Sequence, residues 1–139
     1  MSRERFFLDT AYVLALLNKK DTFHNLATGL LPRVRTAAEV CTTEAVLIEI
    51  GNALGSANRA SAAQFIHQCY ATSNIRVENV STPLMLQALD LYRSRQDKHW
   101  GMTDCVSFVV MAQSRITVAL TADHHFEQAG FSALMLKPD

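Results

Sequence analysis

The chain of 139 residues is 49% hydrophobic and 19% charged, which is typical of a globular protein and predicts a single domain over residues 1–139. Five glycines and three prolines are too few for a fibrous or disordered chain. Thirteen basic and thirteen acidic residues give zero formal charge, which excludes adhesion to nucleic acid or anionic membrane over the whole surface. A local basic patch remains open.

Short apolar runs alternate with longer stretches of helical periodicity along the chain. This alternation is typical of an α/β fold with a mainly parallel sheet flanked by helices. Several short runs are apolar on both faces, as expected of strands that helices cover on both sides. The predicted strands are "RFFL" (5–8), "EVCT" (39–42), "IRVENV" (75–80), "TVAL" (117–120) and "ALML" (133–136). The predicted helices cover residues 10–18, 21–35, 43–56, 59–73, 83–95 and 104–115.

The last of these helices is almost entirely apolar, so we expect it to be buried on most sides. Gly101 interrupts the pattern before it, and Thr103 is the expected N-cap, with Asp104 in the first turn near the positive end of the helix dipole. In the helix at 83–95, four apolar residues are expected in the core: Met85, Leu86, Leu89 and Leu91.

The cysteines and the first residues indicate a reducing compartment. Cys41, Cys69 and Cys105 are odd in number and widely spaced, so they predict small buried core residues and neither a disulfide framework nor a thiolate zinc site. The apolar run in "MSRERFFLD" is too short for a signal peptide, and no window is apolar enough for a membrane span. We therefore expect a cytoplasmic protein without a membrane partner.

Four acids occupy positions where a ligand crevice is expected, beyond the carboxyl ends of parallel strands. Asp9 directly follows the first strand, and Asp123 follows "TVALTA". Glu49 borders the apolar stripe of the helix after the second strand, and Asp104 opens the apolar helix. Taken singly, each has a structural interpretation: a helix N-cap for Asp9 or Asp123, a favourable dipole contact for Asp104, and a partly exposed helix position for Glu49.

As a set, the four acids predict a metal site. Four converging carboxylates repel one another in a site of low dielectric, and no matching Arg or Lys cluster surrounds them in the sequence. Oxygen ligands of this kind suit the hard ions Mg²⁺ or Mn²⁺. Such ions activate water and neutralise charge on a phosphodiester, so hydrolysis of a nucleic-acid backbone is the leading chemistry.

Three stretches of the chain resemble the PIN-domain family, and specifically its VapC-type toxins of bacterial and archaeal toxin–antitoxin pairs. The stretches are "FLDTAYVLALLNKKDTFHNLA" (7–27), "TTEAVLIEIGNAL" (42–54) and "DKHWGMTDCVSFVVMAQSRITVALTADHHFEQAGF" (97–131). They cover about half of the chain, and their order and spacing span nearly all of it. A single "LDT" or "TDC" would mean little, whereas the ordered set is fairly specific.

The resemblance implies a three-layer α/β/α fold with a five-stranded sheet and the activity of a metal-dependent endoribonuclease. It assigns the acidic quartet to Asp9, Glu49, Asp104 and Asp123, as catalytic residues and as ligands of Mg²⁺ or Mn²⁺. It also places Thr10 and Thr103 beside the metal as secondary polar groups. The family often has Ser where this chain has Ala11, so that hydroxyl is missing. The implied partners are an RNA substrate, a small antitoxin protein and a second copy of the chain in a homodimer.

Several other residues near the acids are open to two interpretations. His124 and His125 could serve the metal or the reaction, although we expect one to face solvent and the other to pack with Phe126. Trp100 could stack on a base, although a tryptophan in such a loop more often closes over the core. The arginines are scattered, so any RNA groove must be assembled by folding.

Two other functions compete with metal-dependent RNA cleavage. The first is a PIN-fold module that binds RNA or protein but has lost catalysis, against which the presence of all four acids argues. The second is phosphoryl transfer of the haloacid-dehalogenase or receiver type, which also uses an aspartate after the first strand. The former needs a second Asp where this chain has Ala11, and the latter needs paired acids and a late Lys that are not evident.

Overall fold

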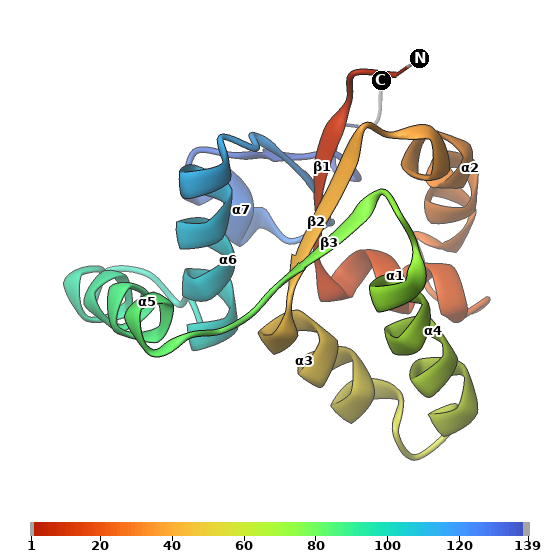
Figure 1. Cartoon of the computed structure of the whole chain (residues 1–139), viewed down its shortest axis with the longest axis horizontal. Coiled ribbons are helices and arrows are strands. Elements are labelled where there is room, and N and C mark those ends of the chain that lie inside the picture. Colours follow the sequence, from red (N-terminus) through yellow and green to blue (C-terminus); the bar gives the residue numbers. More distant parts are fainter. Residues whose placement is uncertain (1, 138–139) are drawn as a thin grey trace.

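Five parallel strands form the sheet at the centre of the protein (Figure 1). The structure is a computed structural model, and it describes residues 2–137. The strands lie in the order β3-β2-β1-β4-β5, and every neighbouring pair is parallel. Their bounds are β1 Arg5–Leu8, β2 Glu39–Thr43, β3 Ile75–Glu78, β4 Val118–Leu120 and β5 Ser132–Ala133. The expected five-stranded parallel sheet is confirmed.

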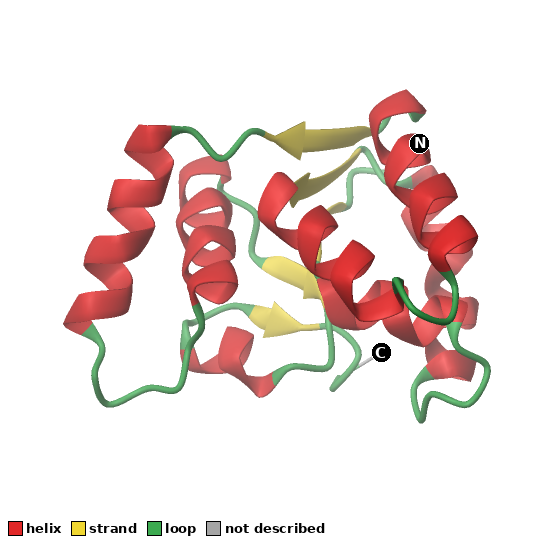
Figure 2. Ribbon diagram, turned by 90° about the horizontal axis from the view of Figure 1, so that it is seen from below, coloured by secondary structure: helices red, strands yellow, loops and turns green. Residues whose placement is uncertain are grey.

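Helices cover the sheet on both sides and complete the expected three layers. Helices α5, α6 and α7 lie on one side and α1, α2 and α4 on the other (Figure 1), with the strands between them in the view from below (Figure 2). The helices are α1 Thr10–Leu17, α2 His24–Thr36, α3 Glu44–Leu54, α4 Arg59–Ala71, α5 Thr82–Ser94, α6 Met102–Ser114 and α7 His124–Gln128. Within residues 2–137, no helix has the length and apolarity needed to cross a membrane.

The central position of β1 in the sheet explains why its residues are apolar on both faces. Phe6, Phe7 and Leu8 are all buried, because side chains of alternating direction meet helices on either side of the sheet. Phe7 is paired with Cys41 of β2 and with Ala119 of β4. This burial fixes the position at which the strand ends and at which the next residue, Asp9, leaves the sheet.

Helix α6 begins two residues earlier than the sequence predicted, so Thr103 is not its N-cap. Gly101 occupies the cap in an extended conformation, and its carbonyl accepts a hydrogen bond from the Cys105 N–H at 3.1 Å. The Gly101 N–H donates to Oδ2 of Asp104 at 3.1 Å. The Asp104 carboxylate thus closes the first turn itself, which leaves Thr103 inside that turn.

Helix α5 corrects a second expectation, because its apolar residues are not all core residues. Leu84 and Ala88 are buried against the neighbouring helix α6, whereas Met85, Leu86 and Leu89 are 43%, 55% and 38% exposed. The helix is an outer one beyond α6 (Figure 1), so only one of its faces is covered.

The cysteines agree with the prediction, since Cys41, Cys69 and Cys105 are free and buried.

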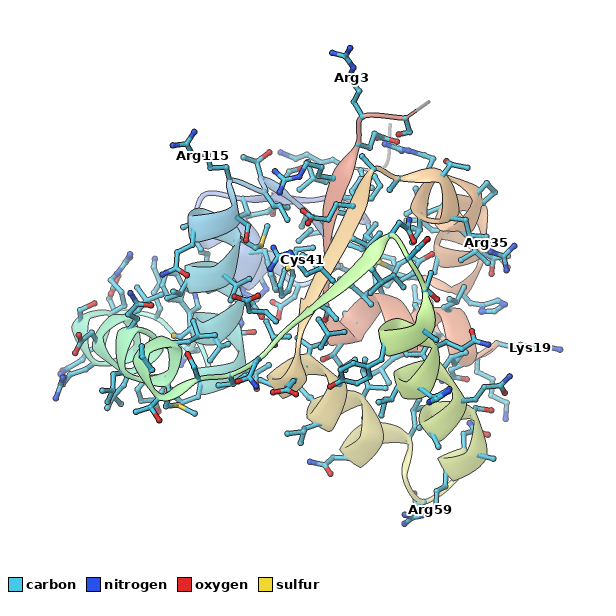
Figure 3. All side chains as sticks on the ribbon, viewed as in Figure 1. Arg3, Lys19, Arg35, Cys41, Arg59 and Arg115 are labelled. Atoms are coloured by element: carbon cyan, nitrogen blue, oxygen red, sulfur yellow. The ribbon has the colours of Figure 1, made fainter. Side chains whose placement is uncertain are left out.

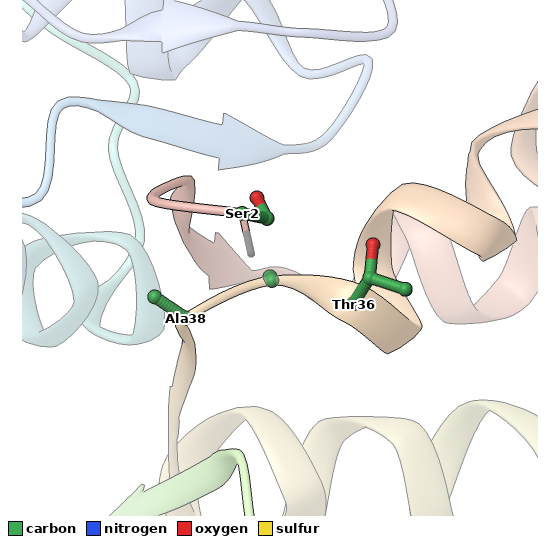
Figure 4. A pocket seen from close by; sticks show the side chains of 4 residues that line it. Ser2, Thr36 and Ala38 are labelled. Atoms are coloured by element: carbon green, nitrogen blue, oxygen red, sulfur yellow. The ribbon is translucent and has the colours of Figure 1, made fainter.

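The amino end of the sheet carries a hollow that lacks catalytic groups. It lies between the first residues and the connection from α2 to β2, where Ser2, Thr36 and Ala38 line it (Figure 4). No titratable side chain is among its lining residues. The chemistry of the described residues is concentrated at the opposite, carboxyl end of the strands.

Candidate active site

The strand order reverses between β1 and β4, and three of the predicted acids, Asp9, Asp104 and Asp123, meet here, while Glu49 is joined to this place through Thr10. The chain continues from β1 to β2 and β3 on one side, while β4 and β5 lie on the other. In parallel sheets such a reversal opens a crevice at the carboxyl ends of the two strands. Asp9 leaves β1 here, and the segment from Thr121 to Asp123 leaves β4.

Thr121 joins these two segments through hydrogen bonds in the core. Its hydroxyl donates to Oδ2 of Asp9 at 2.7 Å and accepts from the Asp123 N–H at 3.0 Å. Thr121 is completely buried, and Asp9 is 6% exposed. Sequence reasoning missed Thr121, although a threonine at the end of a buried strand and two residues before an acid was a usable signal.

Asp9 lies at the N-cap position of α1, yet its side chain makes no capping hydrogen bond to that helix. Burial raises the pKa of Asp9 to about 7, against the opposing effect of the Thr121 hydrogen bond, and the charges of Asp104 and Asp123 add to the increase. The backbone of Thr10 also lowers the pKa of Asp9 through a hydrogen bond, but burial outweighs both contacts. A buried carboxylate beside two others is stabilised as an anion when a cation binds next to it.

Glu49 reaches the site from α3 and is the most exposed of the four acids. The hydroxyl of Thr10, the residue after Asp9, donates to Oε1 of Glu49 at 2.5 Å. Thr10 is 6% exposed and thereby ties the solvent-facing Glu49 to the buried end of β1. Thr10 was expected beside the metal as a secondary polar group, and in the structure its hydroxyl is a donor to Glu49.

His125 lies between the two remaining acids. Its Nδ1 is 3.2 Å from Oδ2 of Asp104 and 3.4 Å from Oδ1 of Asp123. Its backbone N–H also donates to Oδ1 of Asp123 at 2.9 Å, so Asp123 is the N-cap of α7 as well as a member of the cluster. Burial raises the pKa of Asp104, and the charge of Asp123 adds to the increase, against the hydrogen bonds from Gly101 and His125.

The two histidines therefore differ from expectation in one respect. His124 does face solvent, with its side chain 67% exposed. His125 does not serve to pack against Phe126, because its ring contacts the acids, and Phe126 instead packs with Phe7 and Phe108. One atom each from Asp123, His124 and His125 lies within 4.8 Å of the others, with Nδ1 of His125 directed at the acids.

In each of the four carboxylates, one oxygen is held by a donor from the protein. The held oxygens are Oδ2 of Asp9, Oε1 of Glu49, Oδ2 of Asp104 and Oδ1 of Asp123. Among the described residues, no side chain donates a hydrogen bond to the other oxygen of any of the four. Such carboxylates fit a hard divalent ion. The donor at one oxygen fixes the orientation of the carboxylate, and the other oxygen can bind the ion.

Thr103 and Trp100 complete the comparison with the sequence. Thr103 lies in the first turn of α6 next to Asp104, and its carbonyl accepts from Ser107, but no hydrogen bond joins its hydroxyl to the acids in the described part of the chain. Trp100 is 6% exposed, and its Nε1 donates to Gln128 of α7 at 3.0 Å. It closes the loop over the core.

Comparison with known proteins agrees with this geometry. The model of the PIN domain matches residues 6–132. The chain belongs to the PIN-domain family. This membership leaves no support for the haloacid-dehalogenase and receiver alternatives.

Among solved structures, the chain is similar to VapC20 of Mycobacterium tuberculosis, a toxin that cleaves the sarcin-ricin loop. The two are 28% identical with a TM-score of 0.83, over 92% of this chain and 97% of that chain. This match confirms the resemblance to VapC-type PIN proteins. The comparison with curated protein sequences gave no significant match.

Proposed function

We propose that the protein is a divalent-metal-dependent endoribonuclease that hydrolyses RNA phosphodiester bonds, formed as one domain by residues 1–139. The observation that carries this proposal is the set of four carboxylates, each with one oxygen held by a protein donor. Asp9, Glu49, Asp104 and Asp123 would hold Mg²⁺ or Mn²⁺ through the remaining oxygens. RNA as the substrate class is supported by the similarity to VapC20, whose target is an RNA loop.

The bound ion would lower the pKa of a water and offset negative charge on the phosphodiester. The chain's own residues then have defined tasks. Thr121 and Thr10 orient the carboxylates of Asp9 and Glu49 through the hydrogen bonds described above. Because RNA is a polyanion, the four acids repel it unless their charge is neutralised, so binding of the substrate depends on the cation as well.

We further propose that the protein is the toxin of a toxin–antitoxin pair. A small antitoxin protein would silence it, and a homodimer would be its assembled form, as in VapC-type relatives. A reducing cytoplasm suits the three free, buried thiols.

RNA cleavage by the purified protein tests the proposed activity. We expect cleavage with added Mn²⁺ or Mg²⁺, loss of cleavage with EDTA, and no cleavage by Asp104→Asn in either condition. Asparagine still offers an oxygen to the Gly101 N–H, so this variant keeps the start of α6 while losing the charge. A variant that cut RNA as well as the parent would disprove the assignment of Asp104.

The same experiment separates the enzyme from a silent binding module. If RNA is bound in EDTA and is never cleaved with either metal, the chain is a PIN-fold binding protein. A growth test adds independent evidence, since expression of the parent alone should arrest cells and expression of Asp104→Asn should not.

A further inference from the structure

A polar hollow adjoins the acidic cluster at the connection between α5 and α6. Its volume is about 470 Å³, and its lining includes Tyr92, Arg95, Lys98, His99 and Gly101. Gly101 belongs to both sites, because its N–H donates to Asp104 at 3.1 Å. The hollow is therefore lined by the residue whose N–H holds one of the four acids.

The inner wall of the hollow is rigid. Trp100 forms this wall, with its indole packed edge-on against Phe108 at 5.0 Å between ring centroids and hydrogen-bonded to Gln128. The guanidinium of Arg95 lies over the Trp100 ring at 5.0 Å. Arg95 also donates to both oxygens of Asp97, at 3.1 and 3.2 Å. A preformed wall of this kind lowers the entropic cost of ordering a ligand.

The charge of the hollow is positive although the whole chain is neutral. Arg95 and Lys98 carry two positive charges, and Asp97 offsets one of them, with Lys98 Nζ at 3.6 Å from its Oδ2. Elsewhere the labelled cations Arg3, Lys19, Arg35, Arg59 and Arg115 extend outward at separate places on the molecule (Figure 3). The connection between α5 and α6 thus brings positive charge to the edge of the acidic site.

Tyr92 adds a flat apolar surface to this charge. It lies near the end of α5, is 47% exposed and lines the hollow together with Lys98. A positive group beside an exposed aromatic ring is the combination that proteins use for single-stranded nucleic acid, in which phosphates contact cations and bases stack on rings.

We propose that this hollow binds a nucleotide of single-stranded RNA that flanks the cleaved bond. Lys98 contacts the phosphate, and the ring of Tyr92 stacks on the base. The inference rests on the proposed ribonuclease function and assigns part of its substrate contact to residues 92–101. Trp100 supports the wall from within and does not itself stack on the base.

Binding of a short fluorescein-labelled single-stranded RNA, followed by anisotropy at several salt concentrations, tests this assignment. The background is Asp104→Asn with Mg²⁺, so that the RNA is not consumed. Lys98→Ala should weaken binding and lower the slope of log Kd against log salt by about 0.7, the value for one phosphate contact of a single strand. Tyr92→Ala should weaken binding by about fivefold or more.

Two matched variants serve as controls. Tyr92→Phe keeps the ring and should bind as the background protein does. Lys19→Ala removes an exposed cation on the side of the molecule away from α5 and α6 (Figure 3), and it should leave the salt slope unchanged. In proteins that retain Asp104, Lys98→Ala should raise KM for RNA cleavage and leave kcat unchanged.

The outcomes separate this inference from the proposed function. If the parent cleaves RNA but Lys98→Ala and Tyr92→Ala bind RNA with unchanged affinity and salt slope, the hollow is not a nucleotide site and the ribonuclease assignment stands. If the parent neither binds nor cleaves RNA, both fall. Equal weakening by Lys19→Ala would also overturn the assignment, because it would reflect charge in general.

Discussion

The Thr121 hydroxyl donates to Asp9 Oδ2 at 2.7 Å and so connects the ends of the neighbouring strands β1 and β4. The same hydroxyl accepts from the Asp123 N–H. One completely buried threonine therefore fixes two members of the acidic cluster relative to each other. Because both strands are anchored in the core, the two acids are held in place before any ligand binds.

Thr121→Val should destabilise the protein and weaken the metal site. Valine has nearly the shape of threonine but lacks the hydroxyl, so one oxygen of Asp9 and the Asp123 N–H lose their partner. Leaving buried polar groups unsatisfied costs about 1–3 kcal/mol in the free energy of unfolding. Urea unfolding in EDTA measures this cost. Thr121→Ser keeps the hydroxyl and should recover most of the stability; if it does not, packing of the methyl group is responsible instead.

Without metal, the protein should lose stability as the pH rises from 5 to 8. Burial raises the pKa of Asp9 to about 7 in the folded protein, while an aspartate in the unfolded chain has a pKa of about 3.9. Between these values the folded state holds a proton that the unfolded chain has released, so the free energy of unfolding falls with pH and levels off above 7. Asp104, whose pKa is also raised by burial, acts in the same direction.

Urea unfolding in EDTA at pH 5 and pH 8 measures this dependence, and Asp9→Asn isolates the contribution of Asp9. The difference between the two pH values should shrink in Asp9→Asn. Hydrogen bonds from arginines lower the pKa values of Glu4 and Glu39, which is opposite in direction to the change at Asp9. Mg²⁺ should stabilise the parent more at pH 8 than at pH 5, since it competes with the proton. An equal effect at both pH values would contradict the proposed role of Asp9.

The sequence was sufficient to predict five strands, because strands depend on local patterns, although β5 lies at Ser132–Ala133 and not at the predicted 133–136. The same patterns led to the choice of the four acids, which stays a prediction. The run 5–8 is apolar on both faces as a central strand must be, and Asp9, Asp104 and Asp123 follow strands or open a helix that this pattern locates. The exposure of α5 was not predictable from its own residues. Its apolar residues repeat with helical spacing whether one face of the helix is covered or two. The number of covered faces depends on the tertiary structure.

The hydrogen bonds within the site could not be predicted from the sequence either. Thr121 and His125 are separated from their partners Asp9 and Asp104 by 112 and 21 residues, so only the fold brings them together. Thr103 was a reasonable N-cap by residue type, but Gly101 takes that position because the Asp104 side chain reaches back to its N–H. Side-chain contacts over long sequence separations carry no periodic signal.

His125→Ala should weaken metal binding by about tenfold, the lower end of the effect of outer donors that orient metal ligands. The ring of His125 lies between Asp104 and Asp123, and its loss frees both carboxylates to turn. Titration calorimetry with Mn²⁺ measures the affinity independently of catalysis. His125→Asn retains a donor and should recover part of the affinity, which a purely structural role would not predict. His124→Ala, at a side chain that is 67% exposed, is the matched control and should bind Mn²⁺ like the parent.

Glu49→Gln should reduce RNA cleavage by at least about tenfold and leave the thermal stability nearly unchanged. Glu49 is exposed on α3, so the change buries no new polar group, and glutamine can still accept the hydrogen bond from Thr10. What is lost is one negative charge facing the proposed ion. Glu44→Gln is the control on the same helix, because Glu44 contacts Tyr70 and the Val80 N–H and none of the acids. Cleavage rates with Mn²⁺ and melting temperatures of the two variants give the comparison. If both variants cleave RNA equally well, Glu49 is not part of the site.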